Sequence, residues 1–423
     1  MEVFIAKGKE KDSEVKIPTS KSLSHRALLA ASLCNETSII EDLVHNKDTE
    51  ATIRVLKSLG ATFITEENKT IVHGISSINM NIDEVLDCGE SGSTLRFMIP
   101  LFGLMNKEVK FTGHGRLMER PQDVYKKIFN EQGLLFVQEY SILKIKCPLK
   151  SGHYEIKGNI SSQFITGLLY ALPLLDEDSV IKILPPYESK SYVKMTEYVL
   201  EKAGIKIEDH DDVIYIPGKQ KYKSIHMKID GDDSQAAFFA CLSQIKKEKI
   251  TLLGMNQESK QGDHAIIDIL RKYGANITEE KDKTTFLPSM LQATEVDLSD
   301  CPDLGPILFV LASVTEGTSH FINASRLRVK ESDRIACMEE ELKKLGCNIQ
   351  STIDTVTIQG IDKIKENVHL EGHNDHRIVM ALSVLLASIE NGGYISGAEA
   401  IAKSYPGFFE DLEKCGVEVK KYD

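Results

Sequence analysis

Cations lie beside the opening of an apolar helix near the start of the chain. In the stretch PTSKSLSHRALLAASL, Pro18 to Leu33, Lys21 and Arg26 flank the predicted helix start. Unpaired backbone N–H groups already make a helix N-terminus partly positive, so a cation there is unfavourable unless an anion binds nearby. The stretch therefore predicts an anion site.

Three further loops carry cations beside polar or acidic groups. Arg120 precedes Pro121 in MERPQD, the stretch RLRVKESDR packs charged side chains into residues 326–334, and Lys403 stands beside a turn in AKSYPGF. A solvated turn or an ordinary helix cap explains each loop taken singly. Their recurrence favours a clamp for a ligand with several negative charges, beside a carboxylate whose pKa is tuned for acid–base work.

The openings of the predicted buried helices hold most of this chemistry. If the helix starts of both halves of the chain face one cleft, their N–H groups, dipoles and cations form a local anion receptor. The residues at or near these openings are Lys21, Ser22, Arg26, Ser93, Arg96, Ser161, Ser162, Gln163, Asp303, Asp375, His376 and Arg377.

Composition limits the classes of function. The chain has 423 residues, 42% of them hydrophobic, and its 51 Lys and Arg against 63 Asp and Glu give a net charge of −12. This charge does not favour general binding to nucleic acid or anionic lipid, so we expect neither partner. The longest apolar runs, such as residues 306–314, are far short of the roughly 20 residues of a membrane span. We expect a soluble cytoplasmic protein, and a monomer, that binds its anion locally.

The cysteines and histidines predict neither a disulfide framework nor a metal site. The eight cysteines are scattered without a CxxC pair, and buried reduced thiols are the ordinary explanation of such a pattern. His373 and His376 have the spacing of metal ligands, but no third ligand cluster is evident, and His376 fits an anion-binding loop better. We therefore expect activity to need neither a metal nor a thiol.

An internal repeat organises the elements that must position these residues. Six helical segments run into a glycine followed by a short apolar strand, at intervals of 70 to 73 residues. Such a repeat indicates one supersecondary unit used six times, and each glycine predicts a left-handed helix C-cap. The glycines are Gly60, Gly133, Gly204, Gly274, Gly346 and Gly416.

Each repeat predicts one buried and one surface helix. The helices that follow the polar loops are apolar almost continuously, whereas the second helix of a unit, such as residues 332–346, has one apolar face. Short alternating runs between the helices predict strands. Two helices with about four strands make an α/β unit, and three such units can close one domain. The predicted domains are residues 15–226, and residues 1–14 with 227–423.

The ordered motifs resemble those of a known enzyme family. PTSKSLSHRALL, ISSQF, RVKESDR, NDHR and AKSYPGFF occur in this order and spacing, and the likeness covers the whole chain. They are similar to the motifs of the 5-enolpyruvylshikimate-3-phosphate synthases, the 3-phosphoshikimate 1-carboxyvinyltransferases of the shikimate pathway and aromatic amino-acid biosynthesis. The resemblance implies an α/β fold of two similar globular domains, each of three βαβαββ-like units around buried helices, with an active-site cleft between them.

The resemblance also implies which residues bind the two substrates. Bidentate guanidinium groups suit carboxylates and phosphates, and a glycine lets the backbone approach a ligand closely. For shikimate 3-phosphate the implied residues are Lys21, Ser22, Arg26, Ser161, Ser162, Gln163, Ser189, Tyr192, Asp303 and Lys330. For phosphoenolpyruvate they are Lys21, Gly92, Arg120, Gln163, Arg334, Arg377 and Lys403.

The implied reaction is an addition followed by an elimination. The 5-hydroxyl of shikimate 3-phosphate attacks C2 of phosphoenolpyruvate while C3 is protonated, and the tetrahedral intermediate then loses phosphate. We expect Asp303 to receive the hydroxyl proton, and Glu331, with Lys21 or Lys403, to exchange protons with the methylene carbon. Cations can stabilise the developing charge, so the reaction calls for neither a metal nor a redox cofactor.

Two stretches depart from the pattern of many relatives. Where those read Gly-Asn-Ala-Gly-Thr, this chain reads Gly-Glu-Ser-Gly-Ser over residues 89–93, which places Glu90 near an anion site. A position that is often Asn in relatives is Arg326 here, and we assign it no role.

Two other functions remain alternatives. The related transferase that acts on UDP-N-acetylglucosamine shares the fold and the donor but typically carries a Lys-Asn pair, whereas Lys21 is followed by Ser22 here. A binding scaffold with a degenerate site is the second alternative, and the retained Asp303 and Glu331 argue against it. Because site residues fall in both halves of the chain, we expect shikimate 3-phosphate to compact the protein by domain closure.

Overall fold

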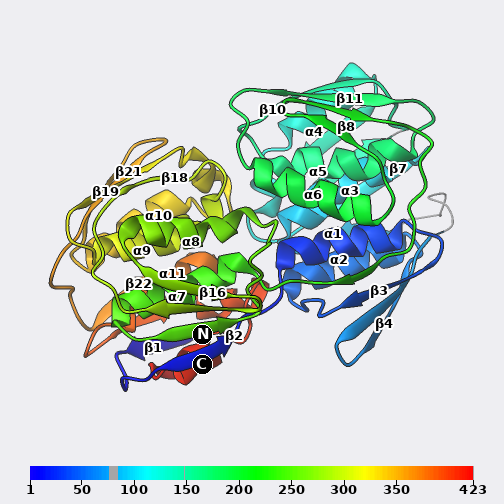
Figure 1. Cartoon of the computed structure of the whole chain (residues 1–423). Helices are drawn as coiled ribbons and strands as arrows, with labels where there is room; N and C mark the ends of the chain where they lie inside the picture. Colours follow the sequence, from blue (N-terminus) through cyan, green and yellow to red (C-terminus); the bar gives the residue numbers. More distant parts are fainter. Residues whose placement is uncertain (76–83, 147, 423) are drawn as a thin grey trace. The chain divides into compact units, whose positions relative to one another are not determined.

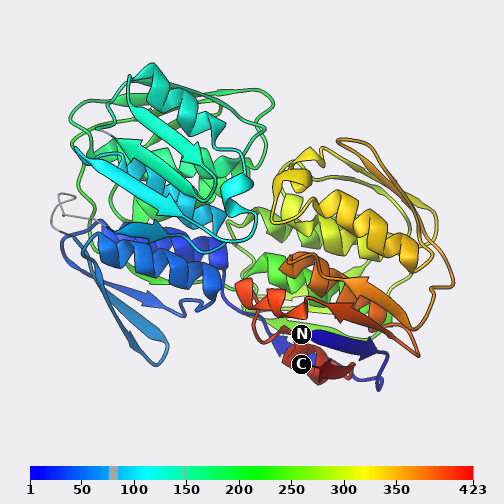
Figure 2. The same ribbon diagram turned by 180° about the vertical axis from the view of Figure 1, so that it is seen from behind.

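The computed structural model describes residues 1–75, 84–146 and 148–422 and divides into two compact units (Figures 1 and 2). One unit is Thr19–Ile229, and the other combines Met1–Pro18 with Asp230–Asp423. The boundaries expected at 14/15 and 226/227 therefore need correction, because they cut two strands. Strand β2 (Ser13–Lys16) pairs with β15 (Ile250–Leu253) of the second unit, and β14 (His226–Lys228) pairs with β3 (Thr37–Glu41) of the first.

Among its described residues, the Thr19–Ile229 unit holds three four-stranded sheets, ordered β14-β3-β5-β4, β6-β7-β9-β8 and β10-β11-β13-β12. In each sheet the first pair is parallel and the next two are antiparallel. The other strands are β3 Thr37–Glu41, β4 Thr62–Glu66, β5 Lys69–His73, β6 Val85–Asp87, β7 Glu108–Thr112, β8 Leu135–Glu139, β9 Ile142–Lys146, β10 His153–Lys157, β11 Ser179–Leu184, β12 Glu208–His210 and β13 Val213–Ile216.

The second unit repeats this sheet pattern, in the orders β16-β17-β15-β2, β18-β19-β21-β20 and β22-β23-β1-β24. The last sheet pairs the two ends of the chain, as Figure 2 shows for the dark-blue N-terminal strand and the red C-terminal segment. The remaining strands of the second unit are β1 Glu2–Ala6, β15 Ile250–Leu253, β16 Asn276–Glu280, β17 Lys283–Leu287, β18 Glu295–Asp297, β19 Thr318–Ile322, β20 Asn348–Ser351, β21 Val356–Gln359, β22 Val368–Glu371, β23 Gly393–Ser396 and β24 Glu418–Tyr422.

The helices alternate between buried and amphipathic, as the sequence predicts. The buried helices of the first unit are α1 Lys21–Ser32, α3 Gly92–Phe102 and α5 Ser162–Ala171, and its amphipathic helices are α2 Lys47–Ser58, α4 Asp123–Glu131 and α6 Lys190–Lys202. In the second unit the buried helices are α7 Asp233–Lys246, α9 Gly305–Ser313 and α11 His376–Leu386, which pack on one another. Its other α-helices are α8 Ile266–Tyr273, α10 Arg334–Lys344 and α12 Phe408–Lys414. Each unit has its own apolar core, to which its buried helices contribute.

Short 3-10 helices complete the connections. They are η1 Leu117–Glu119, η2 Leu172–Leu174, η3 Gly262–Ala265, η4 Pro302–Leu304, η5 Ser325–Val329 and η6 Ala398–Lys403. The six repeat glycines all have positive φ, between 69° and 100°, which confirms the predicted left-handed helix ends.

Capped helix starts bring the polar loops to defined positions. The side chains of Ser20, Ser91 and Ser161 accept backbone N–H bonds at the starts of α1, α3 and α5. Asp232 and Asp375 do the same for α7 and α11. Because a cap fixes how the chain enters its helix, the residues beside each cap are held in place.

Candidate active site

Lys21 is positioned by an acidic partner in the Thr19–Ile229 unit. Its Nζ lies 3.0 Å from Oδ2 of Asp48, near the start of α2, and both side chains are largely buried. A buried chain of hydroxyls from Thr52 through Thr94 to Ser91 then joins α2 to the cap of α3. These polar contacts therefore fix the N-terminal parts of α2 and α3 relative to each other.

Arg26 connects helices α1 and α6 of the same unit. Its guanidinium donates to Oγ1 of Thr196 at 2.9 Å, to the carbonyl of Tyr192 at 3.0 Å and to the carbonyl of Ser22 at 2.8 Å. Burial lowers the pKa of Arg26 to about 10, which leaves it a cation at neutral pH. Arg26 thus brings two of the predicted ligand residues, Ser22 and Tyr192, to one place.

Arg120 and Gln163 converge over the backbone of Gly92. A Cβ added at Gly92 would lie 2.7 Å from Nη1 of Arg120 and 3.4 Å from Oε1 of Gln163. Arg96 donates to that same Oε1 at 2.9 Å, and the amide of Gln163 donates to Oγ of Ser93 at 3.0 Å. Arg120 and Arg96 are both at most 8% exposed, so two buried guanidinium groups and the amide of Gln163 form one cluster.

The serines predicted to bind a ligand lie at helix starts. Ser161 is the N-cap of α5 and accepts from the N–H of Gln163, and Ser162 is the first residue of that helix. Ser189 precedes α6 in the left-handed conformation, with φ 51°, and is fully buried. Its carbonyl accepts from the N–H of Tyr192 at 3.1 Å.

Glu90 lies against the neighbouring loop. A Cβ added at Gly115 would collide with its Oε2, so the carboxylate packs on the turn that carries Gly115. The N–H of His114 donates to the carbonyl of Gly89 at 2.7 Å, which ties the two loops together.

In the other unit a single guanidinium joins three carboxylates. Arg334, whose side chain is 1% exposed, lies 2.9 Å from Oδ1 of Asp303 and 2.7 Å from Oε2 of Glu331. Its Nε lies 2.8 Å from Oδ2 of Asp375, the cap of α11. Asp375 also accepts from Oγ of Ser332 at 3.0 Å. Arg334 therefore holds both predicted proton-transfer carboxylates.

Asp303 is surrounded by cations. Besides Arg334, its carboxylate lies 3.0 Å from Nζ of Lys330 and 3.2 Å from Nη2 of Arg377. Burial disfavours the charged carboxylate, but the three cations outweigh burial and hold the pKa of Asp303 well below its usual range. Burial in turn lowers the pKa of Lys330, although Asp303 opposes that shift.

Lys403 and Arg326 lie at the edges of this group. Nζ of Lys403 donates to the carbonyl of Asn374 at 2.6 Å, which ties η6 to the loop before α11. Arg326 is 5% exposed and close enough to contribute to the lowered pKa of Lys330. Its role stays unassigned.

Two carboxylates of these clusters, Asp48 and Asp263, were not among the residues singled out from the sequence. Asp48 anchors Lys21, and Asp375, named from the sequence only as part of a helix opening, anchors Arg334. Asp263 is a buried carboxyl that accepts from the hydroxyl of Ser234. Burial, and then the charge of Asp303, raise the pKa of Asp263 to about 7.

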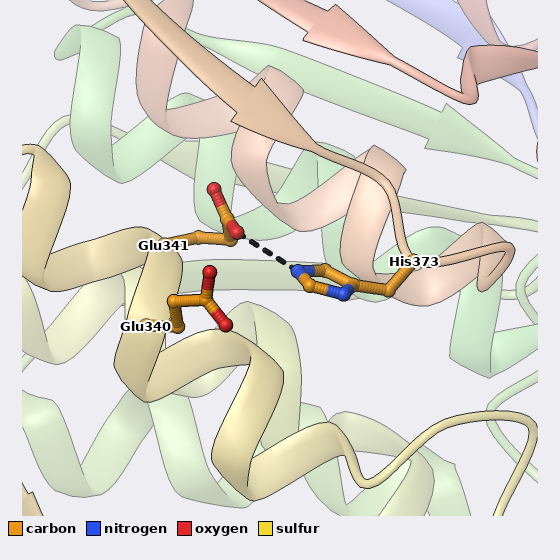
Figure 3. A group of neighbouring side chains, drawn as sticks. All are labelled: Glu340, Glu341 and His373. Carbon is orange, nitrogen blue, oxygen red and sulfur yellow. Dashed lines mark hydrogen bonds and ion pairs between the residues drawn. The ribbon is translucent and has the colours of Figure 1, made fainter.

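A cluster of potential metal ligands lies on α10 and the loop before α11 (Figure 3). One ligand atom each from Glu340, Glu341 and His373 falls within 4.8 Å of the others. The sequence shows no third ligand beside His373 and His376, whereas the fold brings Glu340 and Glu341 beside His373. Nζ of Lys344 already lies 2.8 Å from Glu341 and 3.5 Å from Glu340, so a protein cation pairs with these carboxylates.

Within the described ranges, no helix is both long enough and apolar enough to cross a membrane.

Comparisons with known proteins agree with the fold and the motifs. The family model for EPSP synthase (3-phosphoshikimate 1-carboxyvinyltransferase) matches residues 5–412. The chain is 42% identical over 414 residues to the 3-phosphoshikimate 1-carboxyvinyltransferase of Clostridium kluyveri, covering 97% of this chain and 96% of that protein. It is 42% identical over 418 residues to the protein of the same name from Clostridium novyi, covering 96% of each.

A solved structure of EPSP synthase from Acinetobacter baumannii has the same fold, with a TM-score of 0.81 at 23% identity and 99% coverage of both chains. The match of the family model over nearly the whole length, together with the identity to these relatives, places this chain in the EPSP synthase (3-phosphoshikimate 1-carboxyvinyltransferase) family.

Proposed function

We propose that this chain transfers the enolpyruvyl group of phosphoenolpyruvate to the 5-hydroxyl of shikimate 3-phosphate and releases phosphate. It would thereby serve the shikimate pathway and aromatic amino-acid biosynthesis, as a cytoplasmic monomer. The observation that carries the proposal is the junction at Arg334, where Asp303 and Glu331 meet on one buried guanidinium. Such a junction offers both proton acceptors and an anion-binding cation at one place.

The cations of each unit suit phosphoenolpyruvate, the donor of the enolpyruvyl group. Arg120 and Gln163 over Gly92 offer charged and neutral donors to an anion, and Arg334, Arg377 and Lys403 offer three cations more. Phosphoenolpyruvate carries a carboxylate and a phosphate, for which guanidinium groups form strong, directional hydrogen bonds. Lys21, held by Asp48, adds a point charge for the same ligand.

The hydroxyl-bearing helix starts suit the acceptor. Ser161 and Ser162 at α5, Ser189 before α6 and Tyr192 within it provide donors to a phosphate and partners for ring hydroxyls. A phosphate at a helix N-terminus is further favoured by the exposed N–H groups and the helix dipole.

Asp303 would act as the base only after its cations are shared with substrate. Three cations now hold its pKa well below its usual range, whereas an efficient base has a pKa near the working pH. An anionic ligand that draws Arg334 and Arg377 toward itself would raise the basicity of Asp303. Binding and proton transfer would then be coupled through the same cations.

The identity of the acceptor separates this proposal from its nearest alternative. Phosphoenolpyruvate would be mixed with the protein and either shikimate 3-phosphate or UDP-N-acetylglucosamine, and the products identified by mass spectrometry. We expect an enolpyruvyl ether of shikimate 3-phosphate alone. An ether formed only with the UDP-sugar would replace the proposed acceptor, and ligand binding with no product from either would favour a binding scaffold.

Gly92→Ala should weaken the use of phosphoenolpyruvate. The added Cβ would lie 2.7 Å from Nη1 of Arg120, so the guanidinium must move. Loss of one charge-assisted contact corresponds to a rise of about 10- to 100-fold in the KM for phosphoenolpyruvate. Steady-state kinetics give this value, and the affinity for shikimate 3-phosphate, measured by calorimetry, should be nearly unchanged.

A double-mutant cycle tests the cause of that effect. If the added methyl group acts by displacing Arg120, then Gly92→Ala should add little to the KM of an Arg120→Ala protein. Fully additive effects would show that the methyl group acts on the ligand or the backbone instead.

A further inference from the structure

His25 on α1 touches both of the helices that follow it. Its Nδ1 lies 2.7 Å from Oγ1 of Thr52 on α2, and its ring lies edge-to-face with that of Phe97 on α3. The residue is 1% exposed. Burial, and then the charges of Lys21 and Arg26, hold the pKa of His25 well below its usual range. The imidazole is therefore neutral at neutral pH, with one N–H donor and one acceptor nitrogen.

A chain of three hydroxyls begins at this imidazole. Oγ1 of Thr52 lies 2.7 Å from Oγ1 of Thr94, which donates to Oγ of Ser91 at 2.8 Å. Each hydroxyl has one proton to donate, so Thr94 must accept from Thr52, and Thr52 must accept from His25. The two threonine hydroxyls also lie 3.5 and 3.4 Å from the carbonyl of Asp48, which is longer than an ordinary O–H···O bond. The chain therefore runs one way, from His25 to Ser91.

This direction also assigns the tautomer of the imidazole. The donor to Thr52 is Nδ1, so the proton is on Nδ1, and Nε2 is the unprotonated nitrogen. Nε2 of His25 is buried and has no hydrogen-bond partner in the part of the chain that the structure describes. Orphaned buried N–H groups are rare in proteins, so the surroundings of Nε2 also favour the tautomer with its proton on Nδ1.

We propose that His25 is a positioning residue for Lys21 and Gly92, two of the residues assigned to phosphoenolpyruvate, and that it acts as a neutral Nδ1–H donor. The far end of its hydroxyl chain is Ser91, the cap of α3 directly before Gly92. The near end fixes the first half of α2, where Asp48 holds Lys21. The kinetic part of this role rests on the proposed function, because that function assigns both residues to the ligand.

The tautomer can be measured without any assay of activity. The full chain would be prepared with nitrogen-15-labelled histidine, and a long-range proton–nitrogen correlation spectrum recorded at pH 7. The signals of His25 are those that disappear in His25→Asn. We expect a protonated Nδ1 and an unprotonated Nε2. A proton on Nε2 alone, or on both nitrogens, would contradict the direction of the chain and overturn the proposal.

His25→Leu removes the donor and keeps a buried apolar side chain. Thr52 then loses its donor and the cap before Gly92 loses its support, so the KM for phosphoenolpyruvate should rise by about tenfold or more. The value of kcat and the affinity for shikimate 3-phosphate should change much less, whereas partial unfolding would lower kcat without raising one KM. Steady-state kinetics and calorimetry measure these values. An unchanged KM for phosphoenolpyruvate, or a loss confined to kcat, would overturn the proposal.

Two further variants separate hydrogen-bond donation from the size of the side chain. His25→Asn places an amide N–H near the position of Nδ1, so the KM for phosphoenolpyruvate should stay near the parent value. His73→Leu removes a similar bond, from Nδ1 to Oγ1 of Thr37 at 2.9 Å, at an exposed position on β5, and should not change the kinetics.

The outcomes of these variants decide between the explanations. If His25→Asn raises the KM as much as His25→Leu does, donation from residue 25 is not the cause and the proposal fails. If the parent chain releases no phosphate with the two substrates, the proposed function fails, and the kinetic role of His25 fails with it. The tautomer spectrum distinguishes that result from a failure of the hydrogen-bond chain itself.

Discussion

Asp303→Asn is expected to lower turnover by about two to four orders of magnitude, the usual share of general acid–base catalysis. The substitution keeps the size of the side chain but removes the carboxylate on which Lys330, Arg334 and Arg377 converge. Because an amide cannot accept the hydroxyl proton, the chemical step should slow far more than ligand affinity changes. Steady-state phosphate release, beside calorimetric titration with shikimate 3-phosphate, measures the two effects separately.

The control for this variant lies just before η4, the short helix that carries Asp303. Asp300→Asn changes the same functional group at an exposed position three residues earlier, and it should keep the parent turnover. If Asp303→Asn turns over at near the parent rate, the base is another residue. A loss of ligand affinity as large as the loss of turnover would make Asp303 a binding residue instead.

Glu331→Gln should reduce turnover by a similar factor, about two to four orders of magnitude. Oε2 of Glu331 lies 2.7 Å from Nη2 of Arg334, a contact that the glutamine oxygen can still accept. The variant therefore preserves the position of Arg334 and removes the ability to exchange a proton with the methylene carbon. Turnover in water, together with deuterium uptake into phosphoenolpyruvate in heavy water, reports that exchange.

Glu339→Gln is the matched control, because Glu339 lies on the adjoining helix α10 and pairs with Lys343 away from Arg334. Normal deuterium uptake and turnover in Glu331→Gln would remove Glu331 from the proton path. If Glu339→Gln also lowered deuterium uptake and turnover, the loss in Glu331→Gln would reflect a general effect on this region.

The repeat could be predicted from the sequence because its signals are local. A glycine at a helix end and an unbroken apolar helix are both visible within a dozen residues, and all six glycines adopt the predicted conformation. The domain boundaries were displaced by three or four residues because they depend on strand pairs between distant segments. β2 pairs with β15 across more than 230 residues of sequence, and no local pattern reveals that partner.

The sequence names candidate site residues, but it does not give the contacts between them. Arg334 follows Glu331 by three residues, so their ion pair is local. The bonds from Arg334 to Asp303 and Asp375 join segments more than 30 residues apart and exist only in the folded unit. For the same reason the sequence identifies Lys21 as a candidate site residue but does not identify Asp48 as its ion-pair partner.

The most direct test of the account measures phosphate and product together. The purified full chain would be given phosphoenolpyruvate and shikimate 3-phosphate, with released phosphate followed continuously and the enolpyruvyl ether quantified at the same times. The account predicts one phosphate per ether formed, and no release when either substrate is left out. Failure to release phosphate with both substrates present, or release that proceeds without shikimate 3-phosphate, would contradict it.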